Sequence, residues 1–396
     1  MNKEHGRTAV RSIVGLVGVA VGAMLPLAAA HAAEKVKVGL MLPYTGTYAA
    51  LGTAITNGFK QYVAEQGGML AGREVEYFVV DDESNPAKAT ENANKLVKRD
   101  EVDVLVGTVH SGVALAMAKV ARDSKTLMII PNAGADELTG PLCAPNVFRT
   151  SFSNSQPTLA LGKPMVERGH KKAVWITWNY AAGEEALEGF EQGYTAAGGT
   201  IIKKLGLPFP NVEFQALLTE IASLKPDAVA CFFAGGGAAK FLRDYHAAGL
   251  HKTIPLYGSG FLTEGVLDAA GEAANGVMTT MHYSDSLDTP RNKKFRLEYA
   301  KAFKLQPDVY AVQGYDTGLL LVHGANKVKG DLSNKKELYA AMEGAVIDSP
   351  RGKWTMSKAH NPIQDMYLRR VENKENKVIG IAQKAVEDPA TGCRMG

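Results

Sequence analysis

Residues 102–138 read VDVLVGTVHSGVALAMAKVARDSKTLMIIPNAGADEL. The short apolar run VDVLVG is typical of a buried parallel strand, and the amphipathic run that starts near Ser111 is typical of a helix. A second apolar run, LMIIP, ends in another small polar loop. Loops that follow neighbouring parallel strands meet at one edge of the sheet. The stretch therefore predicts an open α/β sheet with a ligand crevice where the two loops converge.

These two loops supply the first candidate site residues. Ser111 stands at the start of the predicted helix, where its hydroxyl and the free N–H groups of the first turn face the same space. Such a helix start favours an anion. Asn132 lies in the second loop. The alternative interpretation is structural, with Ser111 only a helix cap and Asn132 only a turn residue.

The first 32 residues have the organisation of a secretory signal peptide. A basic start, MNKEHGRTAVR, precedes an apolar run from Ile13 to Ala30, and Ala30-His31-Ala32 predicts cleavage after Ala32. No cysteine lies near this site, which argues against lipid attachment. A permanent membrane anchor is the alternative. We expect a soluble exported protein, located in a bacterial periplasm.

Composition and charge narrow the class of protein. Removal of Lys3, Glu4, Arg7 and Arg11 with the leader takes the formal net charge from +3 to +1. A nearly neutral chain argues against nucleic acid as a partner. The length suits two domains better than one core. The nine histidines are scattered and form no HExxH pattern, so neither a metal nor another cofactor is expected.

The cysteines indicate at most one disulfide. Cys143, Cys231 and Cys393 are too few for a disulfide scaffold and too far apart in sequence for a zinc site. Cys231 lies in the apolar run AVACFF and is expected to be buried. A bridge between Cys143 and Cys393 is compatible with an oxidising compartment. The sequence leaves open whether that bridge forms.

Strands and helices alternate from residue 36, and the alternation restarts after residue 154. Two successive runs of βα units predict two lobes, each a parallel sheet with helices on both faces. Three long helices without intervening strands follow, and an antiparallel pair of strands closes the chain at about 352–372. We expect the chain to cross between the lobes near residues 150, 280 and 348, and three crossings make a hinge.

Motifs along the whole chain resemble one family. They are VKVGLMLPYTGTYAALG at 36–52, GTVHSGVA at 107–114, IIPNAGADELTG at 129–140, NVFRTSFSN at 146–154, YAAGEEALEGF at 180–190, FFAGGGAAKFL at 232–242 and PLYGSGFLTEG at 255–265. The chain resembles the type I periplasmic binding proteins, the solute receptors of ABC importers, in their branched-chain amino-acid group. The resemblance implies two Rossmann-like lobes with parallel sheets, joined by a three-stranded hinge.

The expected division of the chain follows from the crossings and the resemblance. It comprises a signal peptide at 1–32, lobe I at 33–150 and 281–348, lobe II at 151–280 and 349–385, and a C-terminal tail at 386–396. Closure of the lobes over the ligand, followed by recognition of the closed form by an ABC permease in the inner membrane, is the mechanism that the resemblance implies. A monomer is expected.

The chain departs from the leucine receptors of this family at the ligand. Those receptors place a carboxylate against the ligand's ammonium at the position where this chain has Gly260, and the nearest acid, Glu264, is expected to cap a helix start. Ala182 and Leu51 stand where aromatic side chains are usual, which predicts a roomier pocket. An unpaired buried ammonium is costly. We therefore expect a ligand with a carboxylate, no ammonium and a flat apolar body.

The loops resemble most the subgroup that takes up aromatic acids such as 4-hydroxybenzoate and related lignin-derived acids. The resemblance implies that Ser111 and the N–H groups of Gly112 and Val113 hold the ligand carboxylate, supported by Asn132 and the backbone of Gly134. The ring would lie between aromatic side chains. These predicted wall residues are Tyr48, Tyr180, Phe233 and Tyr283. Ordinary core packing is the alternative role for each of them.

Other functions are less compatible with the sequence. Ser111 beside His110 suggests a hydrolase, but adjacent side chains diverge and the surroundings do not match G-x-S-x-G. The glycines of FFAGGGAAKF match no nucleotide-binding motif. We therefore expect no enzyme activity. Two alternatives stay open: a branched-chain amino acid or small amide as ligand, and a sensor that feeds a membrane signalling protein.

Overall fold

The described part of the chain runs from residue 34 to residue 395 in a computed structural model. The predicted signal peptide at 1–32 lies outside the described residues. Within 34–395, no helix combines the length and the apolar character that a membrane span requires.

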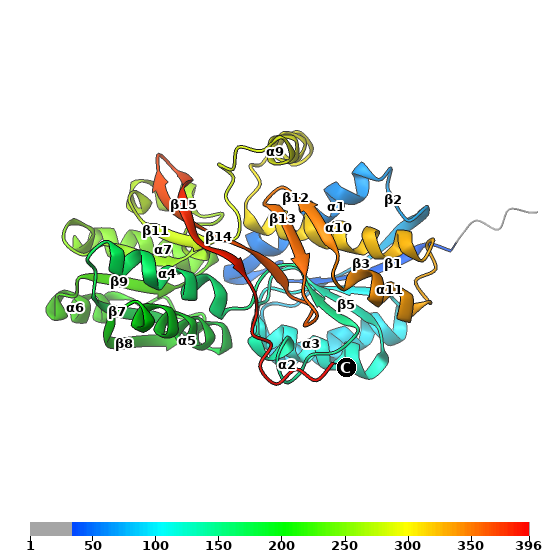
Figure 1. Ribbon diagram of the computed structural model, residues 1–396, viewed down its shortest axis with the longest axis horizontal. Helices are drawn as coiled ribbons and strands as arrows, with labels where there is room; N and C mark the ends of the chain where they lie inside the picture. Colours follow the sequence, from blue (N-terminus) through cyan, green and yellow to red (C-terminus); the bar gives the residue numbers. More distant parts are fainter. Residues whose placement is uncertain (1–33, 396) are drawn as a thin grey trace, which may run out of the picture. The chain divides into compact units, whose positions relative to one another are not determined.

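The first lobe is built on a six-stranded sheet with strand order β2-β3-β1-β4-β5-β6 (Figure 1). All neighbours in this sheet are parallel except β2 and β3, which form a hairpin. Every residue of the two central strands β4 and β5 is buried, as the apolar sequences predict. The strands are β1 (Val36–Leu42), β2 (Met69–Leu70), β3 (Arg73–Asp81), β4 (Val104–Val106), β5 (Leu127–Ile130) and β6 (Val147–Arg149).

Helices cover both faces of this first sheet. Val104 and Val106 of β4 pack in the core that contains α1, whereas Leu105 packs in the core beneath α2 and α3. The helical elements are η1 (Gly46–Tyr48), α1 (Ala49–Glu65), α2 (Pro86–Asn94), the π-helical turn η2 (Lys95–Arg99), α3 (Ser111–Ser124) and η3 (Asp136–Leu138). The amphipathic stretch after the TVH loop is therefore a helix that begins at Ser111, as predicted.

Three later helices follow the second lobe, and the longest of them returns to α1. They are α9 (Pro290–Phe303), α10 (Val309–Lys327) and α11 (Lys335–Met342). The backbones of α1 and α10 touch: a Cβ atom on Gly58 would lie 1.8 Å from the carbonyl oxygen of Ala311, and one on Gly314 would lie 1.9 Å from that of Ile55. The glycines are thus required for this close packing.

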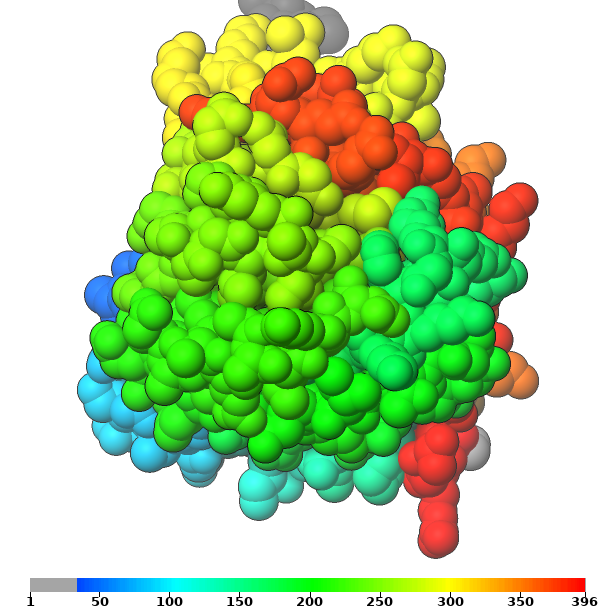
Figure 2. Space-filling model, turned by 90° about the vertical axis from the view of Figure 1, so that its left-hand side faces the viewer, coloured from blue at the N-terminus to red at the C-terminus, as the bar shows by residue number. Residues whose placement is uncertain are grey.

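The second sheet contains five parallel strands, followed across the sheet by antiparallel ones. The order is β12-β13-β14-β11-β10-β9-β7-β8, and β15 pairs with β14. The strands are β7 (Lys172–Asn179), β8 (Thr200–Pro208), β9 (Ala228–Phe232), β10 (Leu256–Ser259), β11 (Met278–Met281), β12 (Val346–Ser349), β13 (Gly352–Met356), β14 (Pro362–Glu372) and β15 (Glu375–Val386). β15 lies at the surface of this lobe, where the C-terminal residues are drawn in red (Figure 2).

The helices of the second lobe follow its strands in regular βα order. They are α4 (Ser155–Glu167), α5 (Ala181–Ala196), α6 (Gln215–Leu224), α7 (Gly235–Ala247), η4 (Leu250–Lys252), η5 (Gly260–Leu262), α8 (Leu267–Ala270) and η6 (Gly271–Ala274). The first turns of α5 and α7 follow β7 and β9 directly. These turns therefore lie at the carboxyl edge of the sheet, where open α/β sheets bind ligands.

The chain passes between the two lobes at residues 150–154, at residues 282–289 and along β14. The sequence predicts the third crossing near residue 348. The structure has it later, because the hairpin of β12 and β13 still contacts α10, where the indole N–H of Trp354 donates to Asp316 at 3.2 Å. β14 then pairs with β13 at its start and with β11 further along.

A disulfide attaches the C-terminal tail to the first lobe. Cys143 and Cys393 are bonded, with their Cα atoms 5.5 Å apart, which answers the question that the sequence leaves open. Cys231 is a buried free thiol, as predicted. Beside the disulfide, the buried Asp388 pairs with Arg149 at 3.3 Å and accepts a hydrogen bond from Thr139 at 2.6 Å. The tail thus runs from β15 in the second lobe back to the first lobe.

Candidate ligand-binding site

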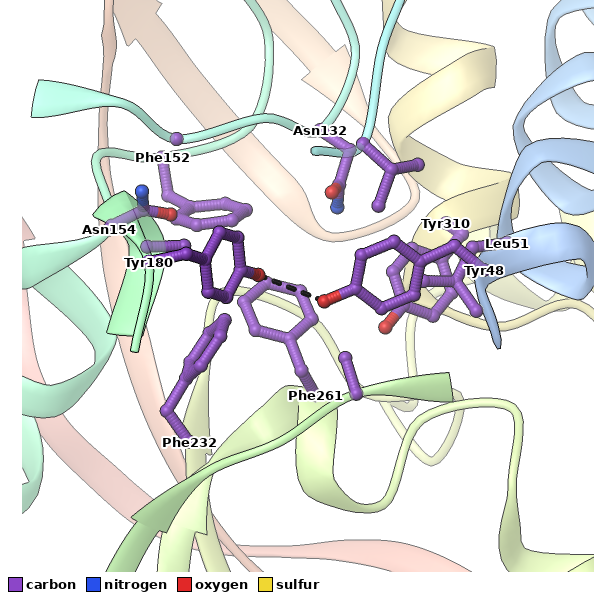
Figure 3. A pocket seen from close by; sticks show the side chains of 13 residues that line it. Tyr48, Leu51, Asn132, Phe152, Asn154, Tyr180, Phe232, Phe261 and Tyr310 are labelled. Atoms are coloured by element: carbon purple, nitrogen blue, oxygen red, sulfur yellow. Dashed lines mark hydrogen bonds between the residues drawn. The ribbon is translucent and has the colours of Figure 1, made fainter. Parts of the chain in front are cut away.

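A pocket lies where the two lobes face each other (Figure 3). It is enclosed by aromatic and small apolar side chains together with two asparagines. The lining residues are Tyr48, Leu51, Val109, Asn132, Gly134, Phe152, Asn154, Tyr180, Ala182, Phe232, Ala234, Phe261 and Tyr310. None of these side chains is an acid or a base.

Five helices begin at the pocket. Residues at or just before the first turns of α1, α3, α5, α7 and α10 line it. The starts of α3 and α10 are closed by side-chain caps, from His110 and Asp308. The start of α5 has no side-chain cap, whereas in the first turn of α7 the Gly237 N–H donates to Thr47 Oγ1 of the first lobe at 3.1 Å. Ala182 and Ala234 at these two starts line the pocket. Unpaired N–H groups and the aligned helix dipoles make such starts favourable for an anion.

Aromatic rings form the broad walls of the pocket. The rings of Phe152 and Phe261 lie 4.9 Å apart between their centres, and the Phe232 and Phe261 rings lie 6.2 Å apart. Tyr310 stacks on Phe261 at 5.9 Å. Rings at these separations touch one another and form a continuous apolar wall, on which the ring of a ligand can pack.

Three tyrosines bring hydroxyl groups to the pocket, and we call Tyr48, Tyr180 and Tyr310 the tyrosine cluster (Figure 3). The hydroxyls of Tyr48, at the start of α1, and Tyr180, at the start of α5, are hydrogen-bonded to each other at 2.9 Å. This bond joins the two lobes across the pocket. Burial raises the pKa of both phenols well above its ordinary value, so both stay protonated.

The two asparagines are fixed by polar partners behind the pocket wall. Asn154 donates from its amide nitrogen to Ser111 Oγ at 3.0 Å and to Glu185 at 2.6 Å, and Asn132 donates to Gln313 at 2.7 Å. Gly134 packs against Asn154, because a Cβ atom there would lie 2.4 Å from the Asn154 oxygen. The amide nitrogen of Asn154 therefore has no N–H left for a ligand.

Four of the predicted site residues line the pocket, namely Tyr48, Asn132, Gly134 and Tyr180. The predicted anion site at Ser111, Gly112 and Val113 does not open into it. The imidazole of His110 folds over this helix start and accepts the Gly112 N–H at 3.1 Å, while Ser111 is covered by Asn154. The histidine cap and a residue from a third loop thus close the site that the helix start suggested.

Three further predicted residues lie elsewhere. Phe233 packs in the core of the second lobe, 4.6 Å from the Phe241 ring and 5.1 Å from that of Trp178. Tyr283 donates to Asn292 at 2.9 Å, away from the pocket. Gly260 lies against Arg369, since a Cβ atom on it would be 2.4 Å from the guanidinium. For Phe233 and Tyr283, the core-packing alternative holds.

Sequence reasoning missed five large or polar lining residues: Phe152, Asn154, Phe232, Phe261 and Tyr310. Two of them stand next in sequence to predicted site residues: Phe232 precedes Phe233, and Phe261 follows Gly260. Alternation along β9 would have indicated that only one of the two phenylalanines faces the cleft, but not which one. Phe152 and Asn154 lie in the first crossing between the lobes, and no local pattern marks them.

Among residues 34–395, no carboxylate side chain lines the pocket, where an ammonium group would need one. Glu264 is buried and pairs with Arg369, and it also accepts the backbone N–H of Val309 at 3.0 Å, at the start of α10. It therefore caps no helix start in its own loop, where the sequence places it, but accepts an N–H at the start of a distant helix. Within residues 34–395, no group of three or more His, Cys, Asp or Glu side chains is arranged to hold a metal ion.

Ser111 and His110 do not form a catalytic pair. The hydroxyl of Ser111 accepts from Asn154, and the His110 nitrogen Nδ1 accepts from a backbone N–H. Burial lowers the pKa of His110 to about 4, so the imidazole is neutral. The arrangement is that of a helix cap and its neighbour, without a nucleophile and an oriented base.

Comparisons with known proteins agree with this geometry. The family model described as periplasmic binding protein matches residues 35–376. A Leu/Ile/Val-binding protein homolog of Brucella abortus is 29% identical over 362 residues, which is 89% of this chain and 92% of that protein. An ABC transporter solute-binding protein of R. palustris, solved with benzoate, is 53% identical with a TM-score of 0.89, covering 91% of this chain and 100% of that one.

A second solved structure, the solute-binding protein of an ABC transporter from Rhodopseudomonas palustris BisB5 in complex with 3,4-dihydroxybenzoic acid, is 33% identical. Its TM-score is 0.85, over 90% of this chain and 99% of that one. These neighbours are substrate-binding proteins, not enzymes. The chain therefore belongs to the periplasmic binding protein family and has the type I fold of the solute-binding proteins of ABC transporters.

Proposed function

We propose that the protein captures a small aromatic carboxylate, such as 4-hydroxybenzoate or a related acid, in the periplasm and presents it to an ABC permease in the inner membrane. One observation carries the proposal. The pocket lining has aromatic walls and no ionised side chain, and the starts of α7 and of α5, which has no side-chain cap, border it. Such a site offers partial positive charge to an anion and no negative charge to a cation.

The shape of the pocket favours a ring over a branched aliphatic side chain. Phe152, Phe232 and Phe261 form an apolar aromatic wall, and the small Ala182 and Ala234 line the pocket beside it. A ring that fills the pocket loses its hydration and stacks on this wall. For a micromolar receptor the total binding free energy is about −8 kcal/mol, which a buried ring and one stabilised carboxylate can supply.

The bound molecules of the solved neighbours support the same class. Benzoate and 3,4-dihydroxybenzoic acid both combine a carboxylate with a flat ring and lack an ammonium group. The relatives named as Leu/Ile/Val-binding proteins favour a branched-chain amino acid as the second candidate. That ligand would bring an ammonium into a pocket in which Glu264 is already paired with Arg369, and an unpaired buried ammonium is costly.

Hinge closure would couple binding to transport. Tyr48 and Tyr180 come from different lobes, so a ligand that contacts both stabilises the closed form. A ligand shifts the equilibrium between the open and closed forms only to the extent that it binds the closed form more tightly than the open form. A permease would recognise the closed pair of lobes. A membrane sensor would recognise the same form, and a pull-down of the closed protein from membranes would distinguish the two partners.

The test is a binding screen on mature protein that has been unfolded and refolded to remove any bound ligand. Benzoate, 4-hydroxybenzoate, 4-coumarate, leucine, valine and benzamide would be compared by thermal shift and calorimetry. A ligand that binds only the folded protein raises the melting temperature by mass action. We expect shifts with the aromatic acids and none with leucine or valine. Binding of leucine or valine alone would refute the proposal.

A further inference from the structure

The hydroxyl of Tyr310 is the one member of the tyrosine cluster that has no hydrogen-bond partner among residues 34–395. Tyr310 is fully buried, in the first turn of α10, and its side chain lines the pocket beside Tyr48 (Figure 3). Buried polar groups are almost always satisfied in native proteins. A buried unpartnered hydroxyl on a pocket wall therefore indicates an atom supplied by the ligand.

The chemistry of the hydroxyl specifies what that ligand atom is. Burial, with Asp308 and Glu264 nearby, raises the pKa of Tyr310 well above its usual value, so the group is an O–H donor at any physiological pH. Its best partner is an anionic acceptor, because hydrogen bonds to a charged acceptor are roughly twice as strong as neutral ones. A carboxylate oxygen meets this requirement.

The surroundings of the cluster point to the same acceptor. Tyr180 immediately precedes the uncapped start of α5. Gly235, the first residue of α7, lies so close to Tyr48 that a Cβ atom there would be 3.2 Å from its ring, and the Gly237 N–H of the same turn donates to Thr47 at 3.1 Å. The uncapped start of α5 and the positive end of the α7 dipole therefore lie next to the tyrosines. At the asparagines, in contrast, the Asn154 N–H groups are already used by Ser111 and Glu185.

We propose that the ligand carboxylate binds at the tyrosine cluster, where it accepts the Tyr310 O–H and replaces the direct bond between Tyr48 and Tyr180. The inference rests on the proposed function, an aromatic carboxylate as ligand. It places the carboxylate in contact with Tyr48 and Tyr310 from one lobe and Tyr180 from the other. The ring then extends between the phenylalanines toward Asn132 and Asn154.

The test compares wild type with Tyr310→Phe, which removes only the hydroxyl. Tyr339→Phe is the matched control, because the Tyr339 hydroxyl is also buried without a partner but lies on α11, outside the pocket. We expect the Kd for benzoate to rise about 10–100-fold in Tyr310→Phe and to stay unchanged in Tyr339→Phe. Neither variant should melt at a lower temperature than wild type without ligand, because no protein hydrogen bond is lost.

A comparison of ligands tests whether the Tyr310 hydroxyl contacts the ligand's carboxylate or another part of the ligand. Benzamide keeps the ring but has no negative charge, so its Kd should rise much less than that of benzoate. If Tyr310→Phe weakens 4-hydroxybenzoate but not benzoate, the hydroxyl contacts the ring substituent and the orientation is wrong. Unchanged benzoate affinity in Tyr310→Phe refutes the inference alone, provided that wild type binds. If wild type binds no aromatic acid, the proposed function fails and the inference fails with it.

Discussion

The hinge contains buried charged side chains, whereas the lining of the pocket contains none. The three buried arginines of the described chain, Arg149, Arg351 and Arg369, all lie at connections between the lobes, and each pairs with a buried carboxylate. The pocket, only a few residues away, has no charged side chain in its lining. At the hinge, each buried arginine is neutralised by a carboxylate of the protein. In the pocket, only helix starts and hydroxyl groups are present to stabilise a charged ligand.

This contrast explains how one interface can be both stable and selective. A buried ion pair is specific for its geometry, and removing one partner leaves an uncompensated charge. The pairs therefore hold residues 149, 351 and 369 in register with segments far away in the sequence. A pocket without fixed charge excludes ligands with an unpaired ammonium by the same cost. Changes to each region should consequently have different consequences, for stability at the hinge and for affinity at the pocket.

The largest expected effect comes from breaking one hinge pair. Arg369→Met leaves the buried Glu264 without its partner and should lower the free energy of unfolding by about 3–5 kcal/mol. The adjacent Arg370 is the matched control, because its pair with Glu372 is exposed. Arg370→Met should lower the free energy of unfolding by less than about 1 kcal/mol. Urea denaturation of both variants measures the difference, and equal losses would mean that burial of the pair is not what matters.

Removal of the disulfide tests whether the buried Arg149–Asp388 pair can hold the tail alone. The Cys143→Ser, Cys393→Ser double variant should lose about 2–4 kcal/mol of stability, since the bond closes a loop of 250 residues. A reductant should lower the melting temperature of wild type and leave that of the variant unchanged. If the variant is as stable as wild type, the ion pair is sufficient and the bond is dispensable.

Filling the pocket should weaken ligand binding without disturbing the hinge. Ala182→Phe puts a ring into the space that the ligand ring would occupy and should weaken benzoate binding about 30–100-fold, equivalent to about 2–3 kcal/mol of ring burial. Ala181→Phe is the control, because Ala181 does not line the pocket. Calorimetry gives both affinities. Equal affinity of Ala182→Phe and wild type would show that the ligand binds elsewhere.

The smallest expected effect is on the pH dependence of the melting temperature, and it comes from the carboxyl groups of Glu185 and Asp136. Glu185 accepts the backbone N–H of Asp136 at 3.0 Å, and burial raises the pKa of Glu185 to about 8 and that of Asp136 to about 6. Carboxyls with raised folded-state pKa values stabilise most below pH 4.5, and this contribution is lost as the pH rises to about 8. Melting temperatures from pH 5 to 8 should therefore fall more for wild type than for Glu185→Gln. Parallel curves would contradict this.

Local sequence patterns were sufficient for most of the fold. The short apolar runs predicted the buried strands β4 and β5, and the amphipathic run after Ser111 predicted α3, because backbone period and side-chain burial are linked within each segment. The family and the two-lobed α/β fold that the motifs implied are confirmed. β15 was missed, since most of its residues are partly or fully exposed and no alternation marks it.

The site depended on contacts that no local pattern contains. The sequence by itself determined that polar loops and helix starts gather at the carboxyl edge of two sheets, because βα order fixes that edge. Only the tertiary structure decided which helix start is open: His110 folds back on α3, and Asn154 arrives from the crossing to cover Ser111. It also decided that Tyr310, 130 residues beyond Tyr180 in sequence, completes the pocket, because lobe packing brings distant first turns together.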